Sequence, residues 1–454
     1  MYYLQYILEV FVAFADRSFE GNEEMPKAAF FTLGCKVNQY ETAALKQQFF
    51  EAGFEIVEPD CLADVYVVNS CTVTAGGDRK SRQALRRMRR QNPVAVICLC
   101  GCFPQAFPED AAIIPEADVI TGSKDRAGLL LAVRQKLAGA PRVVDIKPHD
   151  KSEEFESMNA RDFYSRTRAY VKIEDGCERS CAYCIIPAAR GPVRSKPLHE
   201  IRDEVESLAE LGYAEIVLTG VNLSCYGSDF GLRLIDAVRA ACGCEKIRRV
   251  RLSSLEPELL TREDISEMAA LPKLCPHFHL SLQSGCDETL RRMRRQYTCN
   301  EYSDIIKNLR DAFKNPAITT DVMVGFPGET GDEFLSSLAF CKEQGFARTH
   351  VFAYSKRPGT LAAAMDGQIP DAIKRKRSRI MISNMAASRA VFLDSQLKIP
   401  ADVLFETRRP DGMWEGYSEN YTPVAMYTDD DLSGKTMSVI PESSDGETCF
   451  VNKL

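Results

Sequence analysis

The stretch EDGCERSCAYCIIPAARG, residues 174–191, contains three cysteines in a C-x-x-x-C-x-x-C run at Cys177, Cys181 and Cys184. The apolar segment AYVKI precedes it and is typical of a strand, so we expect the cysteines on the loop at that strand's C-terminal end. Zinc sites and disulfides generally use cysteines in fours or in pairs. Three thiolates instead suit three corners of a 4Fe–4S cluster, which leaves the fourth iron open to a small chelating ligand.

S-adenosylmethionine can bind such an open iron through its amino and carboxylate groups. An electron from the cluster then breaks a C–S bond and gives a 5′-deoxyadenosyl radical, a reaction that side chains alone cannot perform. We therefore predict that Cys177, Cys181 and Cys184 are catalytic cluster ligands, and that Tyr183 limits water and tunes the potential beside them. The alternative is a zinc knuckle, or three cysteines in a core.

Strand-like and helical segments alternate downstream of this loop. Strands are expected at 214–220, 247–254, 277–283, 317–328 and 347–355. Roughly six βα units in about 220 residues predict an α/β fold with a partial TIM-like barrel, in which the chemistry lies on loops at the C-terminal strand ends. A long charged helix at 370–395 is expected to close this domain.

Several of these strand ends carry residues that suit S-adenosylmethionine. Gly220 in LTGVN would let backbone groups approach the methionine moiety, and Gly325 in DVMVGFPGE would let the backbone pair with adenine. Ser253, Ser254 and Glu256 in RLSSLEP are candidates to bind the ribose. A glycine after a strand is usually only a turn, so the prediction depends on the joint placement of these residues on one rim.

A separate alternating series lies upstream and predicts a second parallel sheet. Cys35 in TLGCKVNQYET, Cys71 in VVNSCTVT and Cys102 in LCGCFPQ each follow one of its strands. Parallel strands bring their ends together, so we predict that these three cysteines hold a second cluster with one open iron. Burial as small hydrophobic residues is the alternative, and we prefer it for Cys98 and Cys100, which lie inside a strand.

Composition limits the class of protein. The chain has 454 residues, enough for two or three domains, and its 45% hydrophobic and 27% charged content is typical of a soluble globular protein. Seventeen cysteines, odd in number and clustered in two regions, predict reduced thiolates and a cytoplasmic location. No apolar run approaches the roughly 20 residues of a membrane helix, so no membrane partner is expected. The net charge of −7, taken alone, argues against nucleic acid.

The quoted segments, with GCFPQ, SSLEP and HLSLQSG…LRRMRRQYT, together resemble the radical methylthiotransferases over nearly all of residues 25–454. Around Cys35 and Cys71 the chain is most similar to the MtaB branch, which converts N6-threonylcarbamoyladenosine, just 3′ of the tRNA anticodon, to its 2-methylthio form. The resemblance implies a methylthiotransferase N-terminal domain at 25–148, a radical SAM domain at 163–393 and a small TRAM β-barrel at 394–454. From the residues themselves, we expect a leader or extra segment at 1–24, before the cleaner sequence that opens at Met25, and a polar linker at 149–162.

The resemblance also implies two 4Fe–4S clusters and two uses of S-adenosylmethionine. One molecule methylates a sulfur carried at the Cys35, Cys71 and Cys102 cluster, and a second gives the radical that activates adenine C2. A tRNA anticodon stem-loop and an electron donor such as a flavodoxin-type protein are the implied partners, with no DNA. One departure is Ala188, which stands where the family often has an aromatic residue.

Two basic segments are predicted to hold RNA phosphates, although such runs on helices are usually solvated faces. Their candidate contacts are Arg86, Arg87, Arg291 and Arg292.

By resemblance, the C-terminal barrel should also grip RNA, with Trp414 and Tyr417 stacked on bases. From residue 396 to 454 the chain has 11 acidic and five basic residues, which leaves open whether the barrel contacts RNA or mainly packs on the catalytic body.

Two other functions stay open at this point. One is a methylthiotransferase acting on isopentenyladenosine tRNA or on a ribosomal protein. The other is a non-enzymatic iron–sulfur carrier, which would have no use for an open cluster beside a nucleoside-binding rim.

Overall fold

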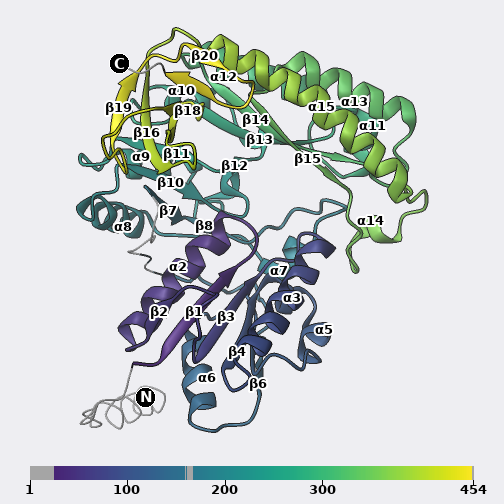
Figure 1. Cartoon of the computed structure of the whole chain (residues 1–454). Coiled ribbons are helices and arrows are strands. Elements are labelled where there is room, and N and C mark those ends of the chain that lie inside the picture. The colour runs from purple at the N-terminus through teal and green to yellow at the C-terminus, as the bar shows by residue number, and fades with distance from the viewer. Residues whose placement is uncertain (1–24, 159, 161–166, 452–454) are drawn as a thin grey trace.

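The computed structural model of the chain describes residues 25–158, 160 and 167–451, which form three consecutive units (Figure 1). The expectation for residues 1–24, and part of the linker expected at 149–162, fall outside the described residues. Within the described ranges, no helix combines the length and the apolar character needed to cross a membrane.

The N-terminal unit is a parallel sheet covered by helices on both faces. Its strand order is β2 (Glu55–Val57), β1 (Lys27–Thr32), β3 (Val65–Ser70), β4 (Val96–Gly101), β5 (Val119–Thr121) and β6 (Val143–Asp145). The covering helices are α2 (Lys36–Glu51), α3 (Ala75–Gln91), α4 (Cys102–Ala106), α5 (Pro108–Ala112) and α6 (Ala127–Leu137). Both faces of β3 and β4 are buried, which explains the apolar runs VYVV and VICLC within them.

Helix α3 shows why the sequence folds in this way locally. The Thr74 side chain accepts a hydrogen bond from the Gly77 backbone N–H and starts the helix. Ser81, Ala84, Leu85 and Met88 are buried at helical spacing, so the arginines between them face outward.

The central unit is an incomplete parallel barrel. One sheet holds β7 (Arg168–Lys172), β10 (Glu215–Thr219) and β11 (Arg249–Leu252), and the next holds β12 (Ser254–Leu255), β13 (His277–Gln283), β14 (Ala317–Val324) and β15 (Arg348–Ala353). Only Ser253 separates β11 from β12, so the two sheets continue one another. The predicted partial barrel is confirmed.

Helices cover the outside of this barrel and short elements form its rim. The longer helices are α8 (Leu198–Glu210), α9 (Leu234–Cys242), α10 (Arg262–Ala269), α12 (Cys299–Ala312), α13 (Gly331–Gln344) and α15 (Asp371–Ser395). The short elements are β8 (Glu174–Asp175), α7 (Ile186–Arg190), β9 (Arg194–Ser195), η1 (Leu223–Cys225), η2 (Pro257–Leu259), α11 (Asp287–Arg292) and α14 (Leu361–Ala364).

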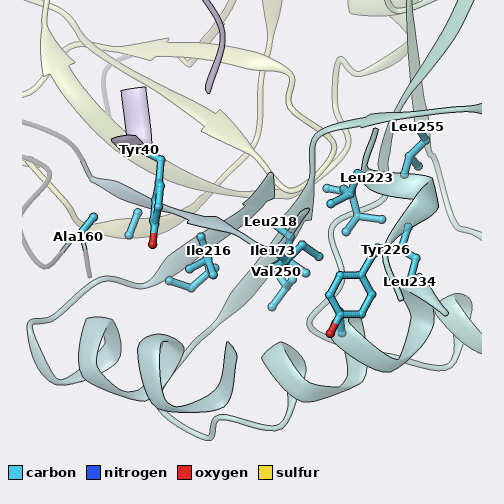
Figure 2. Packing of buried hydrophobic residues seen from close by; sticks show 14 of the residues in the cluster. Tyr40, Ala160, Ile173, Ile216, Leu218, Leu223, Tyr226, Leu234, Val250 and Leu255 are labelled. Carbon is cyan, nitrogen blue, oxygen red and sulfur yellow. The ribbon is translucent and has the colours of Figure 1, made fainter. Parts of the chain in front are cut away.

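The first two units share one hydrophobic core. Figure 2 shows Ile216, Leu218 and Val250 packed in the barrel wall, with Tyr40 of α2 reaching the same cluster from the N-terminal unit. The Tyr40 hydroxyl donates a hydrogen bond to the Met158 carbonyl oxygen and lies 2.9 Å from Glu204 Oε1. The two units are therefore packed together as one body.

The C-terminal unit is a curled sheet in the order β19 (Thr436–Val439), β16 (Ala401–Arg408), β17 (Trp414–Ser418), β18 (Pro423–Met426), β21 (Cys449–Val451) and β20 (Ser443–Ser444). It is consistent with the expected small barrel. Arg249 donates to the Asp402 and Tyr417 carbonyls and Arg251 to the Glu419 carbonyl. These contacts dock the unit on the central barrel.

Candidate active site

The three N-terminal cysteines lie at one edge of the first sheet. Cys35 precedes α2 directly after β1, Cys71 follows β3, and Cys102 opens α4 after β4. Since β1, β3 and β4 are neighbours in the sheet, their C-terminal ends bring the cysteines together. The Cys102 thiol interacts electrostatically with both Cys71 and Cys35, as the strand positions predict. Cys98 and Cys100 are buried inside β4, as expected.

Two glycines allow these loops to approach one another closely. Gly34 has φ +106°, and a Cβ at this position would lie 2.7 Å from Cys71 Cβ and 3.1 Å from Cys71 Sγ. Gly101 has φ +93°, and its Cβ would lie 2.8 Å from the Ser70 carbonyl oxygen. Only glycine fits both the backbone conformation and the space at these two positions.

Asn38 and Asn69 tie the loops together. Asn38 Nδ2 donates to the Leu33 carbonyl at 2.8 Å and to the Ser70 carbonyl at 2.9 Å, which joins the ends of β1 and β3. Asn69 Nδ2 donates to the Asn38 carbonyl at 3.0 Å. Their amide groups therefore fix the loops that carry Cys35 and Cys71.

Arg190, which belongs to the central unit, reaches across to this cysteine trio. Its side chain is buried, and Nε donates a hydrogen bond to Cys102 Sγ at 3.1 Å while Nη2 donates to Asn38 Oδ1 at 2.6 Å. Burial opposes the charge, but Cys102, Glu41 and Asp175 hold the pKa of Arg190 well above its usual value. The sequence alone assigned Arg190 no role, because its partners Cys102 and Asn38 lie 88 and 152 positions away along the chain.

A cluster of buried charges surrounds Arg190 between the two units. Lys172 Nζ lies 2.9 Å from Glu41 Oε1 and 2.6 Å from Asp175 Oδ2, and Arg126 Nη2 lies 2.6 Å from Glu41 Oε1. Burial raises the pKa of the Glu41 carboxyl, but Arg126, Arg190 and Lys172 outweigh it and lower that pKa. Glu41 is therefore ionised at neutral pH, as a buried and fully paired carboxylate.

The second trio lies on the loop after β8, at the rim of the central barrel. The Cys177 N–H donates to the Gly191 carbonyl, and the Cys184 N–H to the Cys181 carbonyl, each at 3.0 Å. The Cys184 thiol interacts electrostatically with Cys181 and Cys177. Arg295 Nη1 lies 3.4 Å from Cys181 Sγ.

The chemistry of both trios fits a metal cluster. Burial raises the pKa of Cys184 and of Cys102 to about 12, so a thiolate there needs a strong positive charge such as bound metal. No three His, Cys, Asp or Glu side chains in the described ranges lie close enough to chelate a single metal ion. Each trio nevertheless brings three interacting thiols together, which is the donor set that a 4Fe–4S cluster with one open iron uses.

Polar atoms without partners mark the rim beside the second trio. Four buried atoms within the described ranges have no hydrogen-bond partner: Glu174 Oε1, Asn222 Oδ1, Ser253 Oγ and Gln283 Oε1. Buried polar atoms are normally satisfied, so this set fits a polar ligand such as S-adenosylmethionine. Asn222 and Gln283 did not emerge from the sequence, because neither belongs to a metal-ligand or glycine pattern.

The two rim glycines have close neighbours that the sequence did not predict. A Cβ at Gly220 would lie 2.5 Å from Glu174 Oε2, so this glycine makes room for a buried glutamate. Gly325, with φ +73°, donates its backbone N–H to Glu329 Oε2 at 2.7 Å. That N–H is therefore engaged within the protein, and the pairing of this backbone segment with adenine stays a prediction.

The other rim residues lie near Arg295. Glu256 forms an ion pair with the Arg295 guanidinium, and Tyr183 Oη lies 3.4 Å from Arg295 Nη1. The Tyr183 ring packs edge-to-face on Phe326 with centroids 6.5 Å apart, which forms an aromatic wall beside the cysteines. Ser254 is exposed, whereas Ser253 is buried.

The predicted RNA contacts fall into distinct environments. Arg86 is exposed and lies 3.2 Å from Glu116, and Arg87 lies over the Phe31 ring at 5.4 Å. Arg291 is exposed on α11, but Arg292 forms an ion pair with Glu333 at 2.6 Å.

Of the two aromatic residues predicted to stack on bases, Trp414 is buried and Tyr417 is partly exposed. Trp414 is only 8% exposed and packs in the core of the C-terminal unit. Tyr417 stacks on Tyr421 with centroids 4.6 Å apart, and Arg168 of the barrel lies 5.1 Å from its ring. Trp414 therefore stabilises the core of its unit, whereas the predicted base contact of the partly exposed Tyr417 stays a prediction.

Comparisons with known proteins agree with this arrangement. The Radical SAM superfamily matches residues 171–341, and the Uncharacterized protein family UPF0004 matches residues 27–122. The chain is 39% identical to the threonylcarbamoyladenosine tRNA methylthiotransferase MtaB of Bacillus subtilis (strain 168), over 91% of this chain and 93% of that protein. It is 30% identical to the tRNA-2-methylthio-N(6)-dimethylallyladenosine synthase of Akkermansia muciniphila, over 94% of this chain and 98% of that protein.

Solved structures support the fold. The radical S-adenosylmethionine methyltransferase TsrM from Kitasatospora setae, with cobalamin and a [4Fe-4S] cluster bound, matches with a TM-score of 0.54. The match covers 75% of this chain and 77% of that one at 15% sequence identity, so it bears on the fold alone.

Proposed function

The chain belongs to the threonylcarbamoyladenosine tRNA methylthiotransferases, and from that membership we propose that its two cysteine trios divide the reaction between them. The protein is a radical S-adenosylmethionine enzyme that methylthiolates adenine C2 of N6-threonylcarbamoyladenosine in tRNA. In our assignment, Cys177, Cys181 and Cys184 hold the cluster that binds S-adenosylmethionine. The N-terminal trio, Cys35, Cys71 and Cys102, holds the other cluster.

The substrate explains why the enzyme requires these cofactors. The C2–H bond of adenine is neither acidic nor electrophilic enough for a side-chain base or nucleophile. When bound, the clusters and S-adenosylmethionine supply the radical and the methylthio group that this bond requires.

The side chains of the protein prepare the site for that chemistry. Asn222 and Ser253 offer free polar atoms to S-adenosylmethionine, and the Tyr183–Phe326 wall excludes water beside it. Arg190 fixes the loop of Cys102 against the central unit. Glu256 pairs with Arg295 and, at 3.7 Å, with Arg179, and these contacts position its carboxylate at the rim.

The target adenine is easy for the enzyme to reach when it lies in an anticodon loop. A base there is not locked in a duplex, so turning it into the site costs less than flipping a paired base. We propose the tRNA anticodon stem-loop as the bound form of the substrate, with Arg86, Arg87 and Arg291 among its phosphate contacts. A flavodoxin-type electron donor and a cytoplasmic location complete the proposal.

The observation that supports the division of labour is the separate placement of the two trios, with Arg190 joining the two units. The N-terminal trio lies at the C-terminal ends of the parallel strands β1, β3 and β4, and the other trio lies on the single loop after β8. Anaerobic reconstitution should give about eight irons per chain, since two cubes hold about four each. Nucleosides from a deletion strain should lack 2-methylthio-N6-threonylcarbamoyladenosine by mass spectrometry. If only the methylthiolated dimethylallyladenosine disappeared instead, the substrate would be that of the related branch.

A further inference from the structure

A basic groove of about 640 Å³ lies where the N-terminal unit meets the central barrel. Helix α3 and the start of α5 form one wall, and the segment between β15 and α14 forms the other. Figure 1 shows α14 on the same side of the molecule as α3 and α5. Five basic side chains line the groove against two acidic ones: Arg79, Arg82, Arg86, Lys356 and Arg357, with Asp78 and Asp110.

The floor of the groove is rigid. Arg357 is buried and lies over the Phe107 ring at 4.7 Å. Its Nη2 donates to Asp78 Oδ2 and to Thr72 Oγ1, both at 2.7 Å. The Ala75 N–H donates to Ser355 Oγ at 3.1 Å, which adds a second link between the two units. These contacts use the charges of Asp78 and Arg357 inside the protein.

The walls, in contrast, include positive charges that form no ion pair within the part of the chain that the structure describes. Arg79 and Lys356 are exposed, and neither forms an ion pair within the described ranges. They come from different units and face the same groove. An anion that bridges them would contact both units at once, and a phosphodiester backbone carries such anions at regular spacing.

The position of the groove relates it to the reaction. Thr72, which accepts the hydrogen bond from Arg357, is the residue directly after Cys71. Phe107 lies five residues after Cys102. A strand of RNA in the groove would therefore run beside the loops of the N-terminal cysteine trio, where a base leaving the anticodon loop has to arrive.

We propose that this groove receives the phosphodiester backbone of the anticodon stem-loop, held by Arg79 and Lys356 from opposite walls. The proposal rests on the proposed function, because it takes tRNA as the substrate. An acidic electron-donor protein is the other partner such charge would suit. RNA is favoured because the cations line a concave groove that leads to the Cys71 loop.

The test measures binding of a fluorescent anticodon stem-loop containing N6-threonylcarbamoyladenosine to the reconstituted full-length protein, over a range of salt concentrations. The variant Arg79→Glu/Lys356→Glu should weaken binding about tenfold or more at low salt and reduce the slope of log K against log salt by about two. The matched control Arg202→Glu/Lys307→Glu changes net charge equally at exposed positions on α8 and α12. It should change the dissociation constant less than about twofold.

Iron content and melting temperature show whether each variant is folded. If the two double variants weaken binding equally, or if the groove variant keeps the wild-type salt slope, the groove assignment is refuted. Unchanged RNA binding with slower reduction by flavodoxin would assign the groove to the electron donor and refute it as well. A wild type that binds the stem-loop without forming product would instead refute the proposed function, because binding is measured without turnover.

Discussion

Arg190 Nε lies 3.1 Å from Cys102 Sγ, although the two residues are 88 positions apart and belong to different units. Cys102 Sγ, which we assign to the N-terminal cluster, thus accepts a hydrogen bond from the central unit, and that unit carries the cysteines of the other cluster. Donors to ligand sulfur tune the reduction potential of a cluster. Arg190 is for this reason a positioning residue whose effect can be measured apart from turnover.

Arg190→Gln should shift the midpoint potential of the N-terminal cluster to a more negative value. The variant removes a positive charge and a donor to sulfur, both of which favour the reduced cluster. A potentiometric titration followed by electron paramagnetic resonance would check this. The cluster at Cys177, Cys181 and Cys184 in the same sample is the internal control, and an equal shift of both signals would contradict a local role.

Cysteine variants in the two trios should affect different steps of the reaction. Cys181→Ala should abolish formation of 5′-deoxyadenosine, because the cluster that binds S-adenosylmethionine loses a ligand. Cys71→Ala should keep part of that cleavage but stop methylthiolation. Each variant should retain about four irons of the expected eight or so. Identical behaviour of both variants in the cleavage assay would disprove the division of labour.

Gly34→Ala should lower cluster loading more than it lowers stability. Its φ of +106° would cost an L-residue about 1–2 kcal/mol, and the new methyl group would also press on Cys71. Gly53→Ala is the matched control, with φ +89° and nothing within 4 Å of its Cβ. Both variants should lose similar stability in urea, and only Gly34→Ala should lose iron. Equal iron contents would show that the loop adapts.

Glu41→Gln should destabilise the protein by about 3–5 kcal/mol, because Arg126, Arg190 and Lys172 all lose the buried carboxylate that they share. Urea denaturation at neutral pH measures the loss. The exposed pair Glu210–Lys246 is the control, and removing it should cost less than about 1 kcal/mol. A loss of similar size at both sites would show that the buried cluster does not hold the units together.

Glu174 should make stability depend on pH. Burial raises its pKa from 4.5 to about 8, so the folded state keeps a proton that the unfolded state releases. Stability should therefore fall as pH rises from about 4.5 to about 8, by at most about 1.4 kcal/mol per pH unit. Glu174→Gln removes this slope, as denaturation at about pH 5 and about pH 8 would reveal. A wild-type slope in the variant would mean that another group titrates.

The sequence predicts the local features of this protein well and the long-range ones poorly. Alternating strands and helices are visible because each element carries its own periodicity, and the cysteines are visible because each follows a strand. The three-residue strands β2 and β6 escape prediction because they are too short for any period to appear.

Side-chain partners distant in sequence are the other limit. Arg295 belongs to a basic run that suggests RNA, but it is buried against Glu256, 39 positions away. Trp414 is an aromatic residue of the kind that stacks on bases, but its side chain packs in the core of the C-terminal unit. In both cases the sequence shows what a side chain can do, and tertiary packing decides which neighbour it meets.

The shared core around Tyr40 has a consequence for how the enzyme handles its substrate. Because the N-terminal unit and the barrel are joined by one apolar cluster and one set of buried charges, the gap between the two sulfur-bearing loops is set before any RNA arrives. The protein therefore holds its two cysteine-bearing loops at a fixed distance from each other. The RNA therefore has to change its conformation to fit this fixed distance. A nucleotide in a loop is selected because it leaves its stacked position easily and can extend between the two cysteine-bearing loops.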